Sequence, residues 1–345
     1  MSWLPGPPGS SAPAPAPYVV LADRAGSSEF AALRHTLSRL GVPSVRVDAG
    51  GVAALALSVS VGDGTVTVDG HPIAPTVVWA RHLSPRAAPG AADPAAGMLR
   101  ADSWRALIGQ LGALAPSVLP GGAPGRLEQL AGAARAGIRI PRTVVTTDPG
   151  PAAAAMPGPD VVVKVLDEHF VETAPGLLVG VFPEVVPRAE AARWAPLDFP
   201  VIVQEHVRHD AELRVFHLAG AVYAYAVVKS APDALWRDAT AVAVTPVPVP
   251  PRAAEVVRGL AELWGLIYGA FDLLLDGEEV VFLEVNVDGD WRWFESKAGD
   301  RAVSHAAARM VRALHLRAAG DVISPPPVGI VDFLTLGTPS GRQGR

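Results

Sequence analysis

Two apolar runs around one turn signal constrain the fold of this chain more than any other feature. Tyr268 to Leu275 and Val280 to Val285 have the composition of β-strands, and Asp276-Gly277 between them is typical of a hairpin turn. Strands this apolar must bury at least one face. The chain is therefore expected to contain a largely buried antiparallel sheet near its C-terminal end.

The register of this hairpin follows from the length of its turn. A three-residue loop would pair Leu275 with Glu279 and place Asp272 opposite Phe282. Side chains alternate between the two faces of a strand. Residues an even number of positions apart on one strand are therefore expected to share a face.

Three polar residues interrupt the apolar hairpin, and on this register Asp272, Glu284 and Asn286 lie on one face. Two carboxylates and an amide oxygen suit Mg²⁺, which takes hard oxygen ligands and completes its shell with water and phosphates. The alternative is that the three simply face solvent on a half-exposed sheet. Because their neighbours are almost all apolar, we favour the metal interpretation.

The first third of the chain alternates strands with helices. A strand at Tyr18 to Ala22, a helix at Ser28 to Leu40 and a strand at Val42 to Val47 are followed by a hairpin around Gly62-Asp63-Gly64 and a strand at Thr76 to Trp79. This alternation predicts an N-terminal α/β domain spanning residues 18–120.

The rest of the chain is richer in strands, and we expect two further subdomains, residues 121–200 and 201–335. Ala152 to Asp160 is interpreted as a linker, and Trp291 and Trp293 as alternating core residues on a strand. The remaining elements are expected as helices at Arg126 to Ala136, Arg252 to Leu266 and Val303 to His315, and strands at Ile138 to Val145, Val161 to Leu166, Leu177 to Phe182, Val201 to Glu205, Ala211 to His217 and Ala221 to Lys229.

Composition excludes several classes of function. The chain has no cysteine, which excludes disulfides, thiolate catalysis and cysteine-ligated zinc. A formal charge of −5 argues against a nucleic-acid partner, because phosphate contacts need clustered Lys and Arg. Residues 1–17 resemble a disordered Pro/Ala-rich leader without the features of a signal peptide, and residues 336–345 a flexible tail. No apolar window is long enough for a membrane span, so we expect a cytoplasmic protein.

A second set of candidate residues suits a nucleotide. Lys164 follows Val161-Val162-Val163, and a lysine in a buried strand needs an anion such as a phosphate, unless it sits at an exposed edge. Residues 204–207, with Gln204, Glu205 and Val207, follow another apolar strand and could present backbone groups to an adenine. Glu212 could accept ribose hydroxyls, and Arg214, on the same strand face, could reach a phosphate.

In this order the residues resemble the ATP-grasp superfamily of ligases. The resemblance implies an α/β (α+β) ATP-grasp fold preceded by an N-terminal α/β pre-ATP-grasp domain. It also implies ATP and Mg²⁺ as cofactors. Lys164 would contact the phosphates, Glu205 to Val207 the adenine and Glu212 the ribose, while Asp272, Glu284 and Asn286 would bind magnesium.

Further motifs resemble the graspetide (microviridin-type) peptide maturases within that superfamily. They are Val78-Trp79-Ala80-Arg81, Gln129-Leu130 with Pro141 to Thr146, Tyr268 to Asp272, and Gly289-Asp290-Trp291-Arg292-Trp293-Phe294-Glu295. Arg126 stands where this family usually has a phosphate-binding lysine. Arg237 matches the arginine of the family's Asp-Trp-Arg motif, whereas Leu235 replaces the aspartate.

This resemblance implies that side-chain carboxylates of a ribosomally made precursor peptide are phosphorylated by ATP and then form ester or amide crosslinks. Arg214 and Arg237 would stabilise the acyl phosphate, and the segment from Glu168 to Trp194 would close over the peptide and contact its leader. A homodimer is compatible with the family. A ligase acting on free amino acids or on a peptide terminus is an alternative, as is a non-catalytic peptide- or nucleotide-binding protein.

Overall fold

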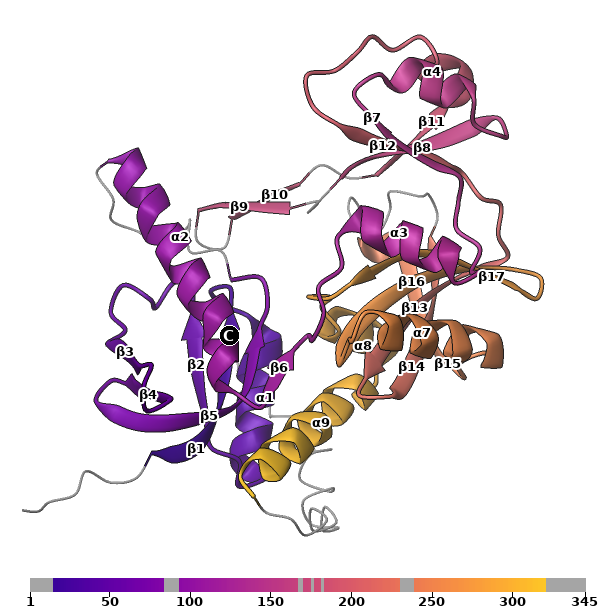
Figure 1. Cartoon of the computed structure of the whole chain (residues 1–345). Coiled ribbons are helices and arrows are strands. Elements are labelled where there is room, and N and C mark those ends of the chain that lie inside the picture. The colour runs from indigo at the N-terminus through magenta and orange to yellow at the C-terminus, as the bar shows by residue number, and fades with distance from the viewer. Residues whose placement is uncertain are drawn as a thin grey trace, which may run out of the picture.

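The protein is described as a computed structural model that covers residues 15–83, 93–166, 170–174, 177–180, 183–229 and 239–320. Three lobes are visible, each built around its own β-sheet (Figure 1). We name them the N-terminal lobe (sheet of β1 to β6), the central lobe (sheet of β7, β8, β11 and β12) and the C-terminal lobe (sheet of β13 to β17). The mixed α/β class predicted from the sequence is confirmed.

The sheet of the N-terminal lobe has the strand order β2-β1-β5-β4-β3, with β6 paired to β5. Strand β1 runs parallel to β2 and β5, and β5 runs parallel to β6. Helices α1 and α9 cover one face, and the C-terminal part of α2 covers the other. The elements are β1 (Ala16–Asp23), α1 (Ser28–Arg39), β2 (Ser44–Asp48), β3 (Leu57–Ser60), β4 (Thr65–Val68), β5 (His71–Ala80), α2 (Pro94–Leu111) and β6 (Ser117–Leu119).

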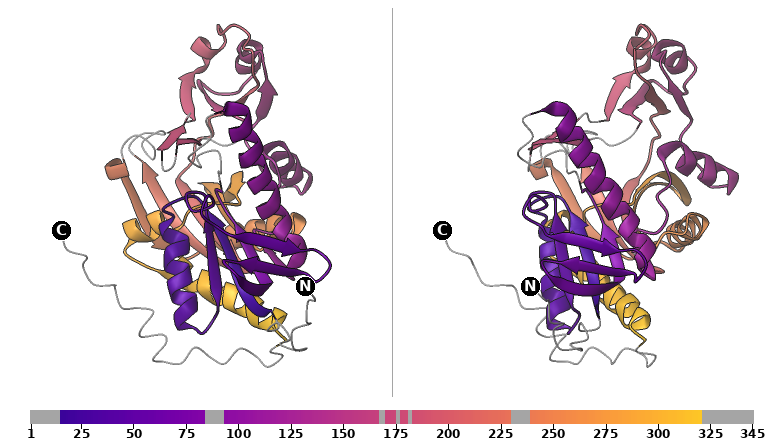
Figure 2. Two further views of the ribbon diagram at one scale, coloured as in Figure 1. Left: turned by 90° about the vertical axis from the view of Figure 1, so that its left-hand side faces the viewer. Right: turned by 60° about the vertical axis from the view of Figure 1, so that its left-hand side comes forward.

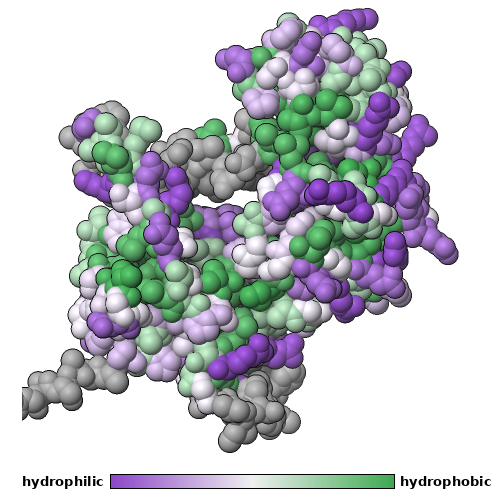
Figure 3. All heavy atoms as spheres, in the orientation of Figure 1, coloured by the Kyte–Doolittle hydropathy of each residue, from purple (hydrophilic) through white to green (hydrophobic). Residues whose placement is uncertain are grey.

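Helix α2 projects from this lobe, and its free end lies on the same side of the molecule as the strand pair β9 (Phe170–Ala174) and β10 (Leu177–Gly180) (Figures 1 and 2). Met98 and Leu99 are exposed near this free end, whereas Ile108 and Leu111 are buried at the other end. Apolar surface gathers around the C-terminal end of α2 and between the N-terminal and C-terminal lobes (Figure 3). The core residues of α2, Ala101, Ile108 and Leu111, therefore lie away from its free end.

The central lobe is a four-stranded sheet in the order β11-β8-β12-β7. A small apolar core that includes Met156, Val161 and Val203 lies between this sheet and the helices α4 and α5. Glu205 is the last residue of β12, so the change from this sheet to the next lies between Glu205 and Ala211. The elements are β7 (Thr143–Thr146), α4 (Pro149–Ala154), β8 (Asp160–Val165), β11 (Glu184–Pro187), α5 (Arg188–Ala191) and β12 (Val201–Glu205).

The C-terminal lobe is an antiparallel sheet in the order β15-β14-β13-β16-β17. Helices α3 and α7 cover one face, where Ala133, Val257 and Phe282 meet in one core. Part of the other face packs against α8 and α9, and Glu284 on this face lies 3.3 Å from Lys164 of the central lobe. The elements are α3 (Arg126–Arg135), β13 (Ala211–Leu218), β14 (Ala221–Lys229), β15 (Val242–Val247), α7 (Pro251–Leu263), β16 (Tyr268–Asp276), β17 (Glu279–Asn286), α8 (Arg292–Ala298) and α9 (Ala302–Ala318).

The hairpin of β16 and β17 exists, but its predicted register is wrong. Asp276 pairs with Glu279 around a two-residue loop, and Asp272 pairs with Glu284 instead of Phe282. Leu283 is the extra residue of a β-bulge next to Asp272. The bulge moves the polar residues by one position relative to the opposite strand.

Three other expectations differ from the structure. Trp293 lies on helix α8 instead of a strand, and the expected strand at Ile138 to Val145 begins only at Thr143. The expected linker includes the end of helix α4, whose Ala153 is fully buried. The side chains of Trp293 and Ala153 pack against a sheet, and the local composition of the sequence did not indicate this.

One aromatic cluster joins the N-terminal and C-terminal lobes. The Trp79 ring stacks on Trp291 at 5.7 Å and lies 5.1 Å from Tyr268, measured between centroids. The backbone also approaches closely at Gly122, where a Cβ atom would lie 1.8 Å from the carbonyl oxygen of Trp264. The two lobes therefore share one core.

Candidate functional site

The predicted metal-binding residues lie together on the face of the C-terminal sheet that α3 and α7 do not cover. Asn286 Nδ2 donates to Asp272 Oδ2 at 3.0 Å and to Glu284 Oε1 at 3.3 Å. The prediction that Asp272, Glu284 and Asn286 share one face is confirmed by these contacts. Turning the Asn286 amide about its terminal bond would present Oδ1 to the same space.

The β-bulge explains how the sequence achieves this arrangement. Phe282 and Val285 belong to the core under α7, so residues 283 and 284 both point to the opposite face. Strict alternation would have placed Leu283 and Glu284 on different faces. The bulge thus brings Glu284 directly opposite Asp272.

Three cations from three elements surround these carboxylates. Lys164 Nζ of β8 lies 3.3 Å from Glu284 Oε2, and Arg126 at the start of α3 forms an ion pair with the same oxygen. Arg214 Nη1 of β13 contacts both carboxylate oxygens of Asp272, at 2.9 and 2.7 Å. The structure therefore brings together residues that are up to 160 positions apart in the sequence.

The electrostatics of the site favour a bound cation. Burial raises the pKa of Asp272, and the neighbouring charge of Glu284 raises it further, while Arg214 lowers it. Two carboxylates side by side repel each other when both are ionised. A divalent cation between them would relieve this repulsion, and two carboxylates with an amide oxygen suit Mg²⁺.

Within the described residues, no three His, Asp or Glu side chains form a metal-binding group. The candidate set has two carboxylates and one amide. Mg²⁺ in nucleotide sites commonly uses one or two carboxylates and takes its other ligands from phosphates and water. The donor set therefore fits magnesium held together with a nucleotide better than an all-protein metal cage.

A small apolar patch lies next to the carboxylates on the same sheet face. It consists of Val207, Leu274 and Val281, which are buried, and Leu283, which packs against them. Val207 follows the central sheet in sequence, so this patch lies at the junction of two lobes. Its chemistry suits the flat apolar face of a base.

Glu212 is held near this patch by two basic side chains. Its carboxylate lies 2.6 Å from Lys229 Nζ and 3.3 Å from His209 Nε2. Lys229 also lowers the pKa of Asp272, so it belongs to the electrostatic surroundings of the site. Lys229 was not predicted from the sequence, although it is a lysine at the end of an apolar strand, which is the pattern that indicated Lys164.

The other predicted residues have different positions. Gln204 Nε2 donates to Thr143 Oγ1 at 2.8 Å, and Glu205 accepts the Arg142 backbone N–H at 3.0 Å, so both side chains stabilise the β12–β7 pair. Their roles in adenine binding stay predictions. Arg237 lies outside the described residues, as does part of the predicted closing segment from Glu168 to Trp194.

A second polar cluster follows the candidate metal ligands directly. Arg81 is buried at the end of β5; its Nη2 donates to the Asp288 carbonyl at 2.9 Å, and it forms an ion pair with Asp290. Arg24 Nη2 also contacts Asp290, at 2.7 Å. Burial opposes ionisation of Asp290, but the neighbouring His82 ring and the charge of Arg81 lower the pKa of its carboxyl group.

The loop that carries these aspartates packs against the first cluster at Gly289. A Cβ atom at this position would lie 2.5 Å from Ala270 Cβ and 2.8 Å from Arg214 Nη2. Tyr268 donates its hydroxyl hydrogen to the Gly289 carbonyl. Arg81 and Asp290 lie within sequence motifs that resemble the graspetide maturases, but no role was predicted for either residue.

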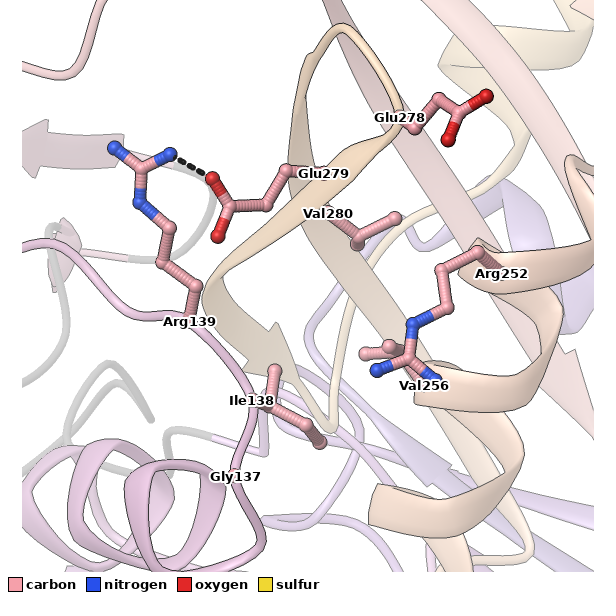
Figure 4. A pocket seen from close by; sticks show the side chains of 8 residues that line it. All are labelled: Gly137, Ile138, Arg139, Arg252, Val256, Glu278, Glu279 and Val280. Atoms are coloured by element: carbon pink, nitrogen blue, oxygen red, sulfur yellow. Dashed lines mark hydrogen bonds and ion pairs between the residues drawn. The ribbon is translucent and has the colours of Figure 1, made fainter.

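One surface pocket lies away from this site, beside the hairpin turn of β16 and β17 (Figure 4). Arg139 and Glu279 form an ion pair at its mouth, and Val256 and Val280 line it. Both valines belong to the core on the opposite face of the sheet. The pocket is therefore separate from the carboxylate cluster.

Comparison with known proteins establishes the fold. No family model and no curated protein sequence matches the chain. Among solved structures, macrocyclase MdnC from Microcystis aeruginosa, bound with precursor peptide MdnA, matches with a TM-score of 0.69 at 19% identity, covering 86% of this chain and 99% of that one.

Two other structures are similar to it. ATP-grasp ligase PsnB, complexed with a phosphomimetic variant of its minimal precursor, Mg and ADP, has a TM-score of 0.64 at 19% identity over 86% of this chain and 98% of its own. D-alanyl-alanine synthetase A from Vibrio cholerae has 0.55 at 13% identity, over 88% and 99%. The chain therefore has the ATP-grasp fold, as predicted from its motifs.

Proposed function

We propose that the protein is an ATP-dependent ligase that activates side-chain carboxylates of a peptide and joins them to hydroxyl or amino groups of the same peptide. The observation that supports this most is the cluster of Asp272, Glu284 and Asn286 with Lys164, Arg126 and Arg214. It unites two acidic ligands with three cations on a fold whose relatives are ligases.

In this proposal ATP lies between the central and C-terminal sheets. Its base rests on the apolar patch of Val207, Leu274, Val281 and Leu283, and Glu212 accepts the ribose hydroxyls. In the structure Lys164 and Arg126 both pair with Glu284. When ATP and magnesium are bound, these two cations neutralise the phosphates instead. Gln204 and Glu205 shape the strand that ends at the base.

Magnesium, held by Asp272, Glu284 and Asn286, would supply charge neutralisation at the transferring phosphoryl group. The protein contributes mainly positioning and electrostatic stabilisation. Arg214 sits beside Asp272 with its Nε unpaired and buried, so it retains hydrogen-bonding capacity for an oxygen of the acyl phosphate. Arg237 stays the predicted second arginine.

The peptide substrate is inferred from the structures that the chain resembles. The structures of MdnC and PsnB contain precursor peptides. Their TM-scores, 0.69 and 0.64, are higher than the 0.55 of D-alanyl-alanine synthetase. The likeness to the synthetase supports a second candidate, a ligase that joins free amino acids. The same cluster would serve either reaction, so the substrate must be determined by experiment.

The test is to incubate the full-length protein with ATP, Mg²⁺ and the peptide encoded beside its gene, and to follow peptide mass. We expect a loss of one water per bond formed. Glu284→Gln should lower the rate by at least about 100-fold, because it removes a charged ligand and leaves the cations of Lys164 and Arg126 without their carboxylate. Glu279→Gln, on the same strand at the exposed hairpin end, is the control and should retain full activity.

Other results would redirect the proposal. ADP formation only with free amino acids, at unchanged peptide mass, would favour the second candidate. No ADP under any condition would indicate a protein that binds without turnover. Full activity of Glu284→Gln would contradict the assignment of the site.

A further inference from the structure

His82 lies where open α/β sheets bind their ligands. It follows β5, whose parallel neighbour β1 ends at Asp23. The chain leaves β1 toward β2 on one side and later returns to β5 on the other side. At such a point the carboxyl ends of the two strands leave a crevice that commonly holds a ligand.

The loop that follows the candidate metal ligands reaches the same place. The ring Nε2 of His82 lies 3.6 Å from Asp290 Oδ1, and the preceding residue, Arg81, donates to the Asp288 carbonyl at 2.9 Å. Asp288 is two residues beyond Asn286, and Gly289 packs against Arg214. Since consecutive Cα atoms are about 3.8 Å apart, the Cα atom of Asp290 lies within about 15 Å of that of Asn286.

The ring of His82 is oriented and partly open. Its backbone has a φ of 38°, a left-handed conformation that is unusual outside glycine and is often found at functional sites. Nε2 is enclosed and lies too far from Asp290 Oδ1, at 3.6 Å, for a direct hydrogen bond, while 31% of the whole side chain is exposed.

Asp290 is well suited to orient this ring. Arg81 and Arg24 hold the Asp290 carboxylate from two sides. A fixed carboxylate beside one ring nitrogen sets the tautomer and leaves the other nitrogen free to accept a proton. Asp23 and Asp288 complete the charged groups around the crevice.

We propose that His82 is the general base of the ligation step, taking a proton from the attacking hydroxyl or neutral amino group at Nδ1. The nucleophile's oxygen or nitrogen bonds to the acyl carbon, the bond from that carbon to the phosphate oxygen breaks, and phosphate leaves with the electron pair. His82 later returns the proton to solvent. This inference rests on the proposed function, because it requires an acyl phosphate.

The test separates activation of the carboxylate from its capture. Hydroxylamine attacks acyl phosphates without a protein base, so it traps the activated peptide as a hydroxamate. The full-length enzyme, ATP, Mg²⁺ and the peptide are used, and crosslinked peptide and hydroxamate are both measured by mass. His82→Gly and His82→Asn are the variants, since both residues accept a positive φ.

We expect both variants to lose crosslinking by at least about 100-fold, while hydroxamate formation stays within about 3-fold of the wild type. Added imidazole should restore part of the crosslinking in His82→Gly. His71→Asn, at the exposed opposite end of β5, is the control and should behave as wild type.

Two results would overturn the assignment of His82. An equal loss of crosslinks and hydroxamate would show that His82 only maintains the structure, and unchanged crosslinking would show that another group takes the proton. A wild-type protein that forms neither product would contradict the proposed function itself, and the inference with it.

Discussion

Buried charges at single positions carry most of the functional information in this protein. Lys164 and Arg214 are almost fully buried, and each contacts a carboxylate of the candidate metal set. A buried charge is costly unless it is paired. The sequence could identify such residues because a charged residue within an apolar strand is conspicuous.

The partners of these residues were harder to infer from sequence. Lys229 pairs with Glu212 across neighbouring strands, and Arg81 contacts Asp290 more than 200 positions away. Nothing local to either residue indicates its partner. Residue type and order thus predicted the candidate site, whereas the ion pairs that support it depend on the tertiary fold.

A different buried residue, His217, makes stability depend on pH. Burial, with a smaller effect of Arg258, lowers its pKa from 6.5 to about 4. The unfolded chain therefore binds a proton below pH 6.5 that the folded chain refuses until about pH 4. The stabilisation is complete above pH 6.5 and should fall by up to about 3 kcal/mol as the pH approaches 4.

Urea denaturation at several pH values across that interval measures this effect. His217→Gln, which can still accept the Gly220 N–H, should flatten the decline. His35→Gln changes an exposed histidine of α1 and should leave the decline unchanged. An identical decline in wild type and His217→Gln would show that other groups cause it.

At the level of elements, strands were predicted better than their register. The apolar runs of β16 and β17 were sufficient to place both strands. Their pairing depends on a two-residue loop and on the bulge at Leu283, which the packing of Phe282 and Val285 under α7 favours. Helix α2 was not predicted, because much of it is exposed and its sequence lacks a clear apolar stripe.

The loop between β17 and α8 is the element whose geometry we expect to matter most. In Gly289→Ala the new methyl group would meet Ala270 Cβ at 2.5 Å and Arg214 Nη2 at 2.8 Å. Overpacking of this kind costs about 1–3 kcal/mol. It should also displace Arg214 from Asp272 and lower ligase activity by more than about 10-fold.

The matched control is Gly259→Ala in helix α7, where nothing lies within 4 Å of an added Cβ. This change should leave activity unaltered and stabilise the protein by about 0.5–1 kcal/mol. Thermal unfolding and the crosslinking assay measure both variants. Wild-type activity in Gly289→Ala would mean that the loop does not position Arg214.

At the scale of the whole molecule, the N-terminal and C-terminal lobes share a core while the central lobe has its own. Trp79, Tyr268 and Trp291 lie in the shared core, and Met156 and Val203 lie in the separate one. The class and the ATP-grasp fold were predictable from motif order. The sharing of one core by two lobes was not, since it depends on contacts between distant segments.

This arrangement predicts coupled unfolding of the N-terminal and C-terminal lobes. Trp291→Ala removes a fully buried ring from the shared core and should cost about 3–5 kcal/mol. Hydrogen exchange should then rise together in β1 of the N-terminal lobe and β16 of the C-terminal lobe, but not in β12 of the central lobe. A rise confined to β16 would contradict a shared core.

The central claim is that the site activates a carboxylate by phosphoryl transfer from ATP. The most direct measurement uses a peptide whose Asp and Glu side-chain carboxylates carry ¹⁸O, and determines the isotope in the phosphate released by the full-length protein. We expect one ¹⁸O atom per phosphate for each bond formed, because the carboxylate oxygen that attacks the γ-phosphorus leaves with it. Crosslinked peptide accompanied by unlabelled phosphate would show that the carboxylate is not phosphorylated.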